Sequence, residues 1–499
     1  MNKGYLKGLF FLILLLGVFF LVVGCVAPLA NRPPEKPNNP FPYNGEVDVS
    51  ITPTLSWNCG DPDGDELTFD IHFGTSTALL PLKESSYTGT SYQPGTLEPN
   101  TTYYWQIVAR DGKGEITKGD VWSFTTVVPS STWERTYGGN NDDEALSIQQ
   151  TVDGGYIVAG YTKSSDAGID DFYVIKLDPY GARVWEKMYG GSDSERAYSV
   201  RQTADGGYIV AGYTKSFGVG EADVYIVKLN NSGEKLWNKT YGGSYNDEAY
   251  SIQQTADEGY IVAGFKCSSS DIESADVYIL KLDSDGNKVW EKTFGGDKED
   301  IARSVQQTED GGYIVAGWTN SSGNGEYDVY ILKLDSDGNK VWEKTFGGSE
   351  SDWAYSIQQT VDGGYIVVGY TYTFGTVWYD VYVLKLNSEG NIVWEQTFGD
   401  SDYEYAHSVK QTADGGYILA GYVFYPPIKS DVYILKLGSD GNKEWEKTYS
   451  GREGSNGGIA YSIQQTVDGG YVVAGACEYP SGSGGNEVYI LKLNDEGGL

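Results

Sequence analysis

Few side chains in this sequence have the type and spacing that catalysis usually needs. The chain has two histidines, His72 and His407, so neither a histidine-cluster metal site nor a Ser-His-Asp triad has enough parts. A sialidase-like site needs several converging arginines, and beyond residue 132 they are few: Arg135, Arg183, Arg196, Arg201, Arg303 and Arg452. No catalytic residue is predicted, with a pair of carboxylates acting on a glycoside as the alternative.

Carboxylates are abundant, since 69 Asp and Glu stand against 36 Lys and Arg and give a formal net charge of −33. Two sets recur at fixed positions. One is Asp143, Glu195, Asp247, Asp300, Asp352 and Glu404, with Gly458 breaking the series; the other is Asp171, Asp223, Asp276, Asp328, Asp380, Asp431 and Glu487. Clustered carboxylates could bind hard cations. Recurrence in every copy favours the alternative, in which each accepts backbone N–H groups in its own loop.

A shorter acidic group, Asp61, Asp63 and Asp65, resembles part of a calcium-binding loop. The bidentate Glu that completes such a loop is missing at the expected spacing. We therefore predict a plain turn and no cofactor, with Ca²⁺ at these three residues as the alternative.

Aromatic residues gather in three consecutive stretches near the end of the chain, whereas the corresponding earlier stretches are mostly Ser, Gly, Asp and Asn. Aromatic rings exposed together typically bind sugars or proteins. The alternative is that they only pack longer loops onto the scaffold. The predicted ligand-binding residues are Trp353, Tyr372, Phe374, Trp378, Tyr379, Tyr403, Tyr405, Phe424, Tyr425 and Tyr479.

A repeat of about 52 residues must position these side chains. A Trp strand recurs at Trp133, Trp185, Trp237, Trp290, Trp342, Trp394 and Trp445, and a second phrase, Gly-Tyr-(Ile/Val)-(Val/Leu)-(Ala/Val)-Gly, recurs with it. Asp-Gly turns and apolar runs divide each copy into four short strands. The second and third strands are apolar throughout, so both of their faces must be covered. Seven such units predict an all-β fold, a seven-bladed β-propeller of four-stranded blades over residues 133–499.

The ends of the repeat region predict how the ring closes. The region begins with a fourth-type strand, Trp133–Tyr137, and ends after a third-type strand, Val488–Leu493. The last blade must therefore take its outer strand from the N-terminal end.

The repeat resembles the seven-bladed β-propeller repeat family of secreted bacterial and archaeal proteins. This likeness rests on Tyr-Gly-Gly, Asp-Gly-Gly-Tyr-Ile-Val-Ala-Gly-Tyr-Thr and Asp-Val-Tyr. The turn Leu-Asp-x-x-Gly-x-x-x-Trp is also similar to the tryptophan motif of quinoprotein propellers. The resemblance implies the fold, and it leaves function open because such propellers serve many roles.

Three segments precede the repeats. Residues 1–24 are predicted to be a lipoprotein-type signal peptide, because Lys3 and Lys7 precede an apolar run and Leu-Val-Val-Gly-Cys25 resembles a lipoprotein signal box. Cys25 would carry the lipid; the alternative is an uncleaved signal anchor. Residues 25–42 form a proline-rich linker. Residues 43–128 resemble a fibronectin type III sandwich, with Trp57 in its core and a tyrosine-corner stretch ending at Tyr103.

Function is expected outside the cytoplasm, on a chain tethered to the cell membrane or outer membrane by its lipid anchor. The strong negative charge makes nucleic acid a poor partner. Cys59, Cys267 and Cys477 fall too far apart in the predicted fold to pair. The predicted function is binding of a glycan or protein by the variable loops of the propeller. The alternatives are a glycoside-acting enzyme and a purely structural envelope protein; the sequence leaves the oligomeric state open.

Overall fold

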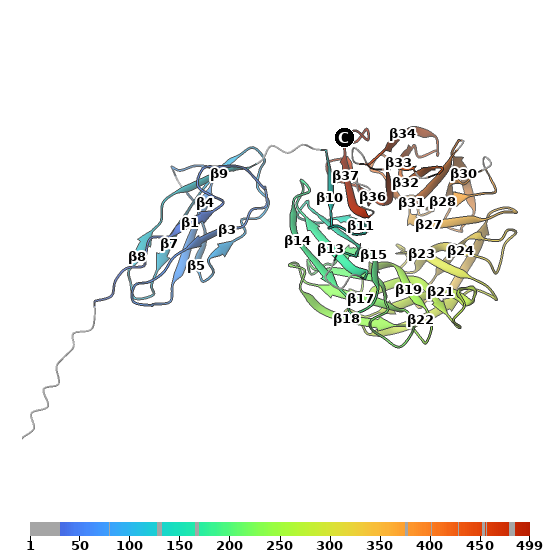
Figure 1. The fold of residues 1–499 in the computed structure, drawn as a ribbon, viewed down its shortest axis with the longest axis horizontal. Coiled ribbons are helices and arrows are strands. Elements are labelled where there is room, and N and C mark those ends of the chain that lie inside the picture. The colour runs from blue at the N-terminus through green and yellow to red at the C-terminus, as the bar shows by residue number, and fades with distance from the viewer. Residues whose placement is uncertain are drawn as a thin grey trace, which may run out of the picture. The chain divides into compact units, whose positions relative to one another are not determined.

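The computed structural model describes residues 30–499 apart from residues 79, 127–131, 165–168, 375–377, 401, 428, 452–454, 456 and 479–484. The predicted signal segment, Cys25 and Tyr479 lie outside the described residues. The chain divides into two compact units, one up to Val127 and one from Val128 onward (Figure 1). In the described part, no helix is both long and apolar enough to cross a membrane.

The first unit contains two β-sheets, one ordered β1-β3-β6 and one ordered β2-β9-β7-β4-β5 with β8 paired to β7. The strands are β1 (Asn38–Phe41), β2 (Glu46–Val49), β3 (Leu55–Asn58), β4 (Thr68–Gly74), β5 (Leu82–Tyr87), β6 (Ser91–Tyr92), β7 (Thr102–Arg110), β8 (Ile116–Lys118) and β9 (Trp122–Thr126).

Aromatic side chains join these two sheets. The ring of Trp57 on β3 lies 5.4 Å from that of Phe69 on β4, in the opposite sheet, and both are buried. The sheets therefore pack face to face around one core. The hydroxyl of Tyr103 accepts a hydrogen bond from the backbone N–H of Glu98 at 2.9 Å, which ties β7 to the preceding turn.

The second unit consists of seven four-stranded antiparallel sheets. We call them blades one to seven in chain order. The first strands are β11 (Asp143–Gln150), β15 (Glu195–Gln202), β19 (Asp247–Gln254), β23 (Asp300–Gln307), β27 (Asp352–Gln359), β31 (Tyr403–Gln411) and β35 (Gly458–Gln465). The second strands are β12 (Tyr156–Thr162), β16 (Tyr208–Thr214), β20 (Tyr260–Cys267), β24 (Tyr313–Thr319), β28 (Tyr365–Thr371), β32 (Tyr417–Tyr425) and β36 (Tyr471–Glu478).

The third and fourth strands complete each sheet. The third strands are β13 (Asp171–Leu177), β17 (Asp223–Leu229), β21 (Ala275–Leu282), β25 (Asp328–Leu334), β29 (Asp380–Leu386), β33 (Lys429–Leu437) and β37 (Asn486–Leu493), with a short 3₁₀ turn, η1 (Ile272–Ser274), before β21. The fourth strands are β14 (Arg183–Tyr189), β18 (Lys235–Tyr241), β22 (Lys288–Phe294), β26 (Lys340–Phe346), β30 (Ile392–Phe398), β34 (Lys443–Tyr449) and β10 (Trp133–Tyr137).

The sheets stand around a common centre, with their first strands innermost (Figure 1). The last sheet is ordered β10-β37-β36-β35, so its outer strand comes from the start of the repeat region, and β36 packs against β11 of blade one. Half of the second and third strands are buried along their whole length, as β12 and β13 are, and the others are buried along most of theirs, because neighbouring sheets cover both faces. The predicted all-β fold with the repeated four-stranded sheets of a propeller is confirmed.

Polar side chains of the first strands link each blade to the next. In every blade, a Ser hydroxyl accepts the backbone N–H of an apolar residue in the next blade; for example, Ile148 N–H of blade one donates to Ser462 of blade seven at 3.3 Å. The last Gln of each first strand likewise accepts a backbone N–H from the first turn of the preceding blade. The recurring Ser and Gln thus hold the ring together.

The recurring tryptophans also serve packing between blades. The ring of Trp185 on β14 contacts Gly233 in the turn of blade two and lies 5.8 Å from the ring of Tyr208. Gly233 has φ +77°, and a side chain there would strike the indole. No disulfide joins Cys59, Cys267 and Cys477 within the described residues.

Candidate functional site

Seven of the ten predicted ligand-binding aromatics form one connected group, which we call the aromatic cluster: Trp353, Tyr372, Trp378, Tyr379, Tyr403, Tyr405 and Phe424. Tyr379 lies at its centre, with ring centroids 5.2 Å from Tyr372 and 5.7 Å from Tyr405. Trp378 joins through Tyr403 at 4.7 Å. The cluster spans blades five and six.

The supporting elements differ from the sequence prediction, which placed all these rings in loops. Tyr372, Trp378 and Tyr379 do lie between β28 and β29, but Trp353 belongs to β27 and Tyr403 and Tyr405 to β31. The first pair of strands in blade six runs on to Tyr403 and Phe424, which are paired across it. Strand pairing therefore fixes part of the cluster on the rigid scaffold.

Two of the remaining three predicted residues, Phe374 and Tyr425, stand apart from the cluster. Phe374 packs on Tyr382 at 5.6 Å, as Phe217 packs on Tyr225 at 5.5 Å in blade two. Tyr425 packs against the core between blades five and six. These contacts agree with the alternative that such rings pack the scaffold, while Tyr479 lies outside the described residues.

Two members of the aromatic cluster present substantial surface to solvent. Tyr372 is 41% exposed and Trp378 is 39% exposed. Trp353, Tyr379, Tyr403 and Tyr405 are half-buried beneath or beside them. Exposed rings backed by other rings form an apolar patch of fixed shape, which suits stacking against a flat apolar face of a ligand.

Further ring contacts connect the cluster to the centre of the propeller. Tyr370 lies 4.8 Å from Tyr405 and stacks on Tyr355 at 5.4 Å. Tyr355 in turn contacts His407 at 4.7 Å. Tyr355 and His407 occupy equivalent positions on β27 and β31, and both line the central channel.

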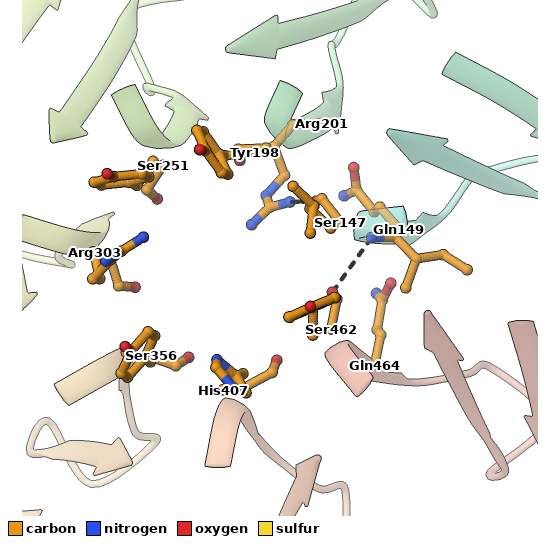
Figure 2. A pocket seen from close by; sticks show the side chains of 18 of the residues that line it. Ser147, Gln149, Tyr198, Arg201, Ser251, Arg303, Ser356, His407, Ser462 and Gln464 are labelled. Atoms are coloured by element: carbon orange, nitrogen blue, oxygen red, sulfur yellow. Dashed lines mark hydrogen bonds between the residues drawn. The ribbon is translucent and has the colours of Figure 1, made fainter. Parts of the chain in front are cut away.

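A cavity of about 340 Å³ occupies this channel and is lined by the first strands of all seven blades (Figure 2). Its wall carries a hydroxyl layer from the recurring Ser residues and a second layer of Tyr198, Tyr250, Tyr355 and Tyr461. Among the described residues that line it there is no Asp or Glu, but there are four basic side chains: Arg201, Arg303, His407 and Lys410. The cavity therefore offers hydrogen-bond donors and positive charge rather than an acid–base pair of carboxylates.

Burial controls the protonation of His407. Burial, together with the charge of the nearby Arg303 guanidinium, lowers the pKa of its imidazole to about 3. The ring is therefore neutral at physiological pH. Arg303 is held by aromatic faces, since its guanidinium carbon lies 3.8 Å from the ring centroid of Tyr250 and 4.7 Å from that of Trp318.

The recurring carboxylates at the starts of the first strands bind their own loops. Asp143 Oδ2 accepts the backbone N–H of Gly139 at 2.6 Å and the hydroxyl of Ser164 at 2.9 Å. The equivalent backbone bond is present at Glu195, Asp247, Asp300 and Asp352. This geometry agrees with the loop-ordering interpretation of the acidic rows.

Glu404 has the most strongly raised pKa in this row. It is 4% exposed, and its Oε2, like one oxygen of Asp143, Asp247 and Asp300, has no hydrogen-bond partner among the described residues. Burial, together with the charges of Asp400 and Asp380, raises the pKa of this carboxyl to about 8. The folded protein therefore holds a proton that the unfolded chain, with a glutamate pKa of 4.5, releases; stability falls as pH rises from about 4.5 to about 8.

Glu404→Gln is expected to stabilise the protein above pH 8 by about 1–3 kcal/mol, because it removes a buried carboxylate without changing its shape. Below pH 4.5 the variant and the parent should have the same stability. Glu195→Gln is the matched control, since both oxygens of Glu195 accept hydrogen bonds, from Gly191, Thr214 and Ser216. Chemical unfolding across this pH range measures the stability of both variants and of the parent. Equal pH profiles for Glu404→Gln and the parent would contradict the raised pKa of Glu404.

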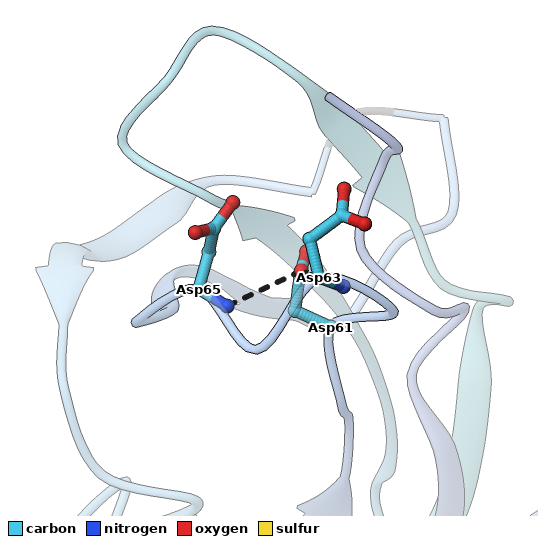
Figure 3. Close-up of side chains that lie close together, drawn as sticks. All are labelled: Asp61, Asp63 and Asp65. Atoms are coloured by element: carbon cyan, nitrogen blue, oxygen red, sulfur yellow. Dashed lines mark hydrogen bonds between the residues drawn. The ribbon is translucent and has the colours of Figure 1, made fainter. Parts of the chain in front are cut away.

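Asp61, Asp63 and Asp65 place one oxygen each within 4.8 Å of one another (Figure 3). Asp61 Oδ1 accepts the backbone N–H groups of Asp63 and Asp65, as in an Asx turn. Arg32 pairs with Asp63 at 2.7 Å and Lys113 with Asp65 at 2.6 Å. Two of the three carboxylates therefore already have cationic partners, which favours the plain turn; Ca²⁺ binding stays an untested alternative.

One family model matches part of the repeat region. Residues 275–492, less than half the chain, match the family model described as outer membrane protein assembly factor BamB. The regulatory protein FlaEY of Caulobacter vibrioides is 27% identical over 174 residues, which is 30% of this chain and 18% of that protein. The chain thus spans less than a fifth of that relative's length.

Two solved structures show distant likeness to the chain. Puromycin hydrolase aligns over 74% of this chain and 55% of its own, with a TM-score of 0.47 and 11% identity. The exotype rhamnogalacturonan lyase YesX aligns over 92% of this chain and 91% of its own, with a TM-score of 0.40 and 13% identity. Likeness at this level carries no information about function. The family match agrees with the resemblance of the repeat turns to quinoprotein-like propellers.

The sequence prediction did not select the basic residues of the channel. Their signal was present as departures from the repeat: Arg201 and Lys410 stand where the other five blades have Gln, in Gln149, Gln253, Gln306, Gln358 and Gln464. Arg303 and His407 similarly replace the Tyr of Tyr198, Tyr250, Tyr355 and Tyr461. A search for arginines close in sequence could not show that Arg201 and Arg303 line the same cavity.

Proposed function

We propose that this chain is a lipid-anchored extracytoplasmic binding protein whose seven-bladed propeller recognises a glycan through the aromatic cluster. The observation that carries the proposal is the exposure of Trp378 and Tyr372 on a base of half-buried rings. Ring faces of this kind stack on the apolar faces of sugars, and supporting rings keep them in place.

The other parts of the chain fit this role. The proposed lipid on Cys25 and the proline-rich linker would tether the protein outside the cytoplasm. The first unit is proposed to be a fibronectin type III-like spacer, supported by buried Trp57 and by the hydrogen bond from Glu98 N–H to the Tyr103 hydroxyl. The match to the BamB family model favours an interaction or structural role in the cell envelope.

Trp378→Ala is expected to weaken glycan binding by at least ~10-fold, because a stacked tryptophan commonly contributes 2 kcal/mol or more to an interface. Phe374→Ala is the matched control from the same loop, since Phe374 is 38% exposed but packs on Tyr382 outside the cluster. A glycan array probed with the parent identifies the ligand, and titration of both variants with it gives the affinities.

The outcomes separate the proposed site from its alternatives. Loss of binding in Trp378→Ala with normal binding in Phe374→Ala supports the cluster. Equal binding by both variants would place the glycan elsewhere. A parent that binds no glycan but captures an envelope protein through Trp378 would assign the cluster to a protein partner.

A further inference from the structure

A ring of glutamine hydrogen bonds runs around the channel and is interrupted at two places. The side-chain oxygen of Gln149 accepts the backbone N–H of Gln202 in the next blade at 2.7 Å, and four further blades repeat this bond at 2.7–2.8 Å. Arg201 and Lys410 occupy the same position in blades two and six. Neither side chain has an oxygen, so neither can make the bond.

These two replacements bring positive charge into the interior, and no carboxylate among the described residues pairs with either. Arg201 Nη1 donates to the carbonyl oxygen of Val200 at 2.7 Å and to the hydroxyl of Ser147 at 3.2 Å, both neutral acceptors. Lys410 makes no hydrogen bond or ion pair with any described residue. Burial lowers the pKa of the Lys410 ammonium to about 8, and the repulsion of Arg201 contributes. The two cations therefore lie close enough to destabilise each other.

The buried lysines of the third strands show how this chain treats a buried cation elsewhere. Lys333, for example, is 7% exposed at its side chain and pairs with Asp310 at 2.9 Å, and the same pair recurs in all seven blades. With 69 acidic residues, the chain has ample carboxylates to place opposite a cation. Their absence from the described wall of the channel leaves the cations directed at the cavity.

Two more groups line the same space. Arg303 has its Nε without a hydrogen-bond partner among the described residues, and so does Nε2 of His407. Figure 2 shows Arg201, Arg303 and His407 projecting from different sides of the channel. Together with Lys410 they converge on one cavity from blades two, four and six.

We propose that the central channel binds a small anionic ligand with a carboxylate or phosphate group, held chiefly by Arg201 and Lys410. A guanidinium donates two parallel hydrogen bonds to such a group, and the ammonium supplies a second charge. Tyr and Ser hydroxyls of the wall donate to the remaining oxygens. The cavity of about 340 Å³ is large enough for a small organic acid or phosphate ester.

Arg201→Gln and Lys410→Gln test the proposal without the usual risk of unfolding. Each installs the residue that five other blades use, which is placed to accept the N–H of Gln254 or Gln465 and complete the ring. Both variants should therefore melt at or above the temperature of the parent. Lys235→Gln is the control, since it removes the same charge from the exposed start of β18.

Titration calorimetry with inorganic phosphate and with citrate, at constant ionic strength, measures the affinity of the channel for each anion. We expect saturable one-to-one binding of at least one probe to the parent and to Lys235→Gln. Arg201→Gln and Lys410→Gln should each weaken it roughly 10- to 100-fold. Preference between the probes distinguishes a phosphate from a carboxylate ligand.

Absence of binding by the parent, or equal affinity in the Arg201→Gln/Lys410→Gln double variant, overturns the proposal. Glycan binding at the aromatic cluster is measured separately and does not depend on the result.

Discussion

Gly317→Ala is expected to lower the free energy of unfolding of the propeller by about 3 kcal/mol or more. A Cβ at this position would lie 1.8 Å from the carbonyl oxygen of Ile301, on the neighbouring first strand. That strand shifts register between Ala302 and Ser304, which brings its backbone against Gly317. Because the obstructing atom is backbone, the two strands must separate. At the equivalent glycine of each other blade, a Cβ would lie 1.7–1.8 Å from the corresponding carbonyl oxygen of that blade's first strand.

Gly311→Asn in the same blade is the control for this substitution. Gly311 has φ +82°, but nothing lies within 4 Å of its Cβ position, and Glu258 occupies the equivalent place in blade three with φ 67°. Asn tolerates this conformation, so the expected loss is about 1 kcal/mol or less. Denaturant unfolding followed by circular dichroism compares the two variants. Similar losses in both would show that the close approach at Gly317 does not limit stability.

These two glycines illustrate how much of the fold the sequence predicts. The Asp-Gly turns and apolar runs define the four strands of each unit, because turn chemistry and burial act locally. The pairing of β10 with β37 is also predictable, since the repeat begins and ends out of phase. The register shift at Ala302 is not, because it depends on how two strands meet in space. The Ser and Gln links between blades likewise depend on blade-to-blade distance.

The candidate sites are also predictable only in part from the sequence. The aromatic residues of blades five and six stand out by composition, but their division into a cluster and scaffold-packing rings needs the structure. Phe374 occupies the place of Phe217 in blade two, so a Phe at this position is not peculiar to blade five. Arg201 and Lys410 are single replacements 209 positions apart in the sequence, and ring closure brings them to one cavity. Comparison of each repeat position across the seven copies is the signal that finds them.

Asp310→Asn is expected to destabilise the propeller more than Lys333→Met does, although each removes one partner of the same ion pair. Lys333 is 7% exposed at its side chain, whereas Asp310 is 64% exposed. Without the negative charge, the Lys333 ammonium is left buried with neutral partners: the amide oxygen of the new Asn, Thr308 and the carbonyl oxygen of Leu334. Breaking buried pairs costs about 3–5 kcal/mol, and water access to Asp310 reduces this to about 2 kcal/mol.

The double variant Asp310→Asn/Lys333→Met removes the buried cation together with its carboxylate partner. We expect it to recover part of the loss seen in Asp310→Asn alone, which a double-mutant cycle measures by denaturant unfolding. Lys333→Met alone should lose about 1 kcal/mol, since Asp310 keeps water, Thr308 and the N–H of Gly312 as partners. A larger loss for Lys333→Met than for Asp310→Asn would contradict the buried-cation account.

Acid sensitivity provides a second test of the same pair. Burial opposes the ionisation of Asp310, but hydrogen bonds from Thr308 and Lys333 outweigh it and lower the pKa of this carboxyl to about 2. The pKa values of Asp205, Asp362 and Asp414 are lowered to about 2 in the same way. Because the folded pKa lies below the unfolded value of 3.8, this stabilisation is complete above about pH 4 and is lost as pH falls towards 2. Since the blades repeat the pair, the parent should unfold steeply in this window, and Asp310→Asn should lose less stability there than the parent.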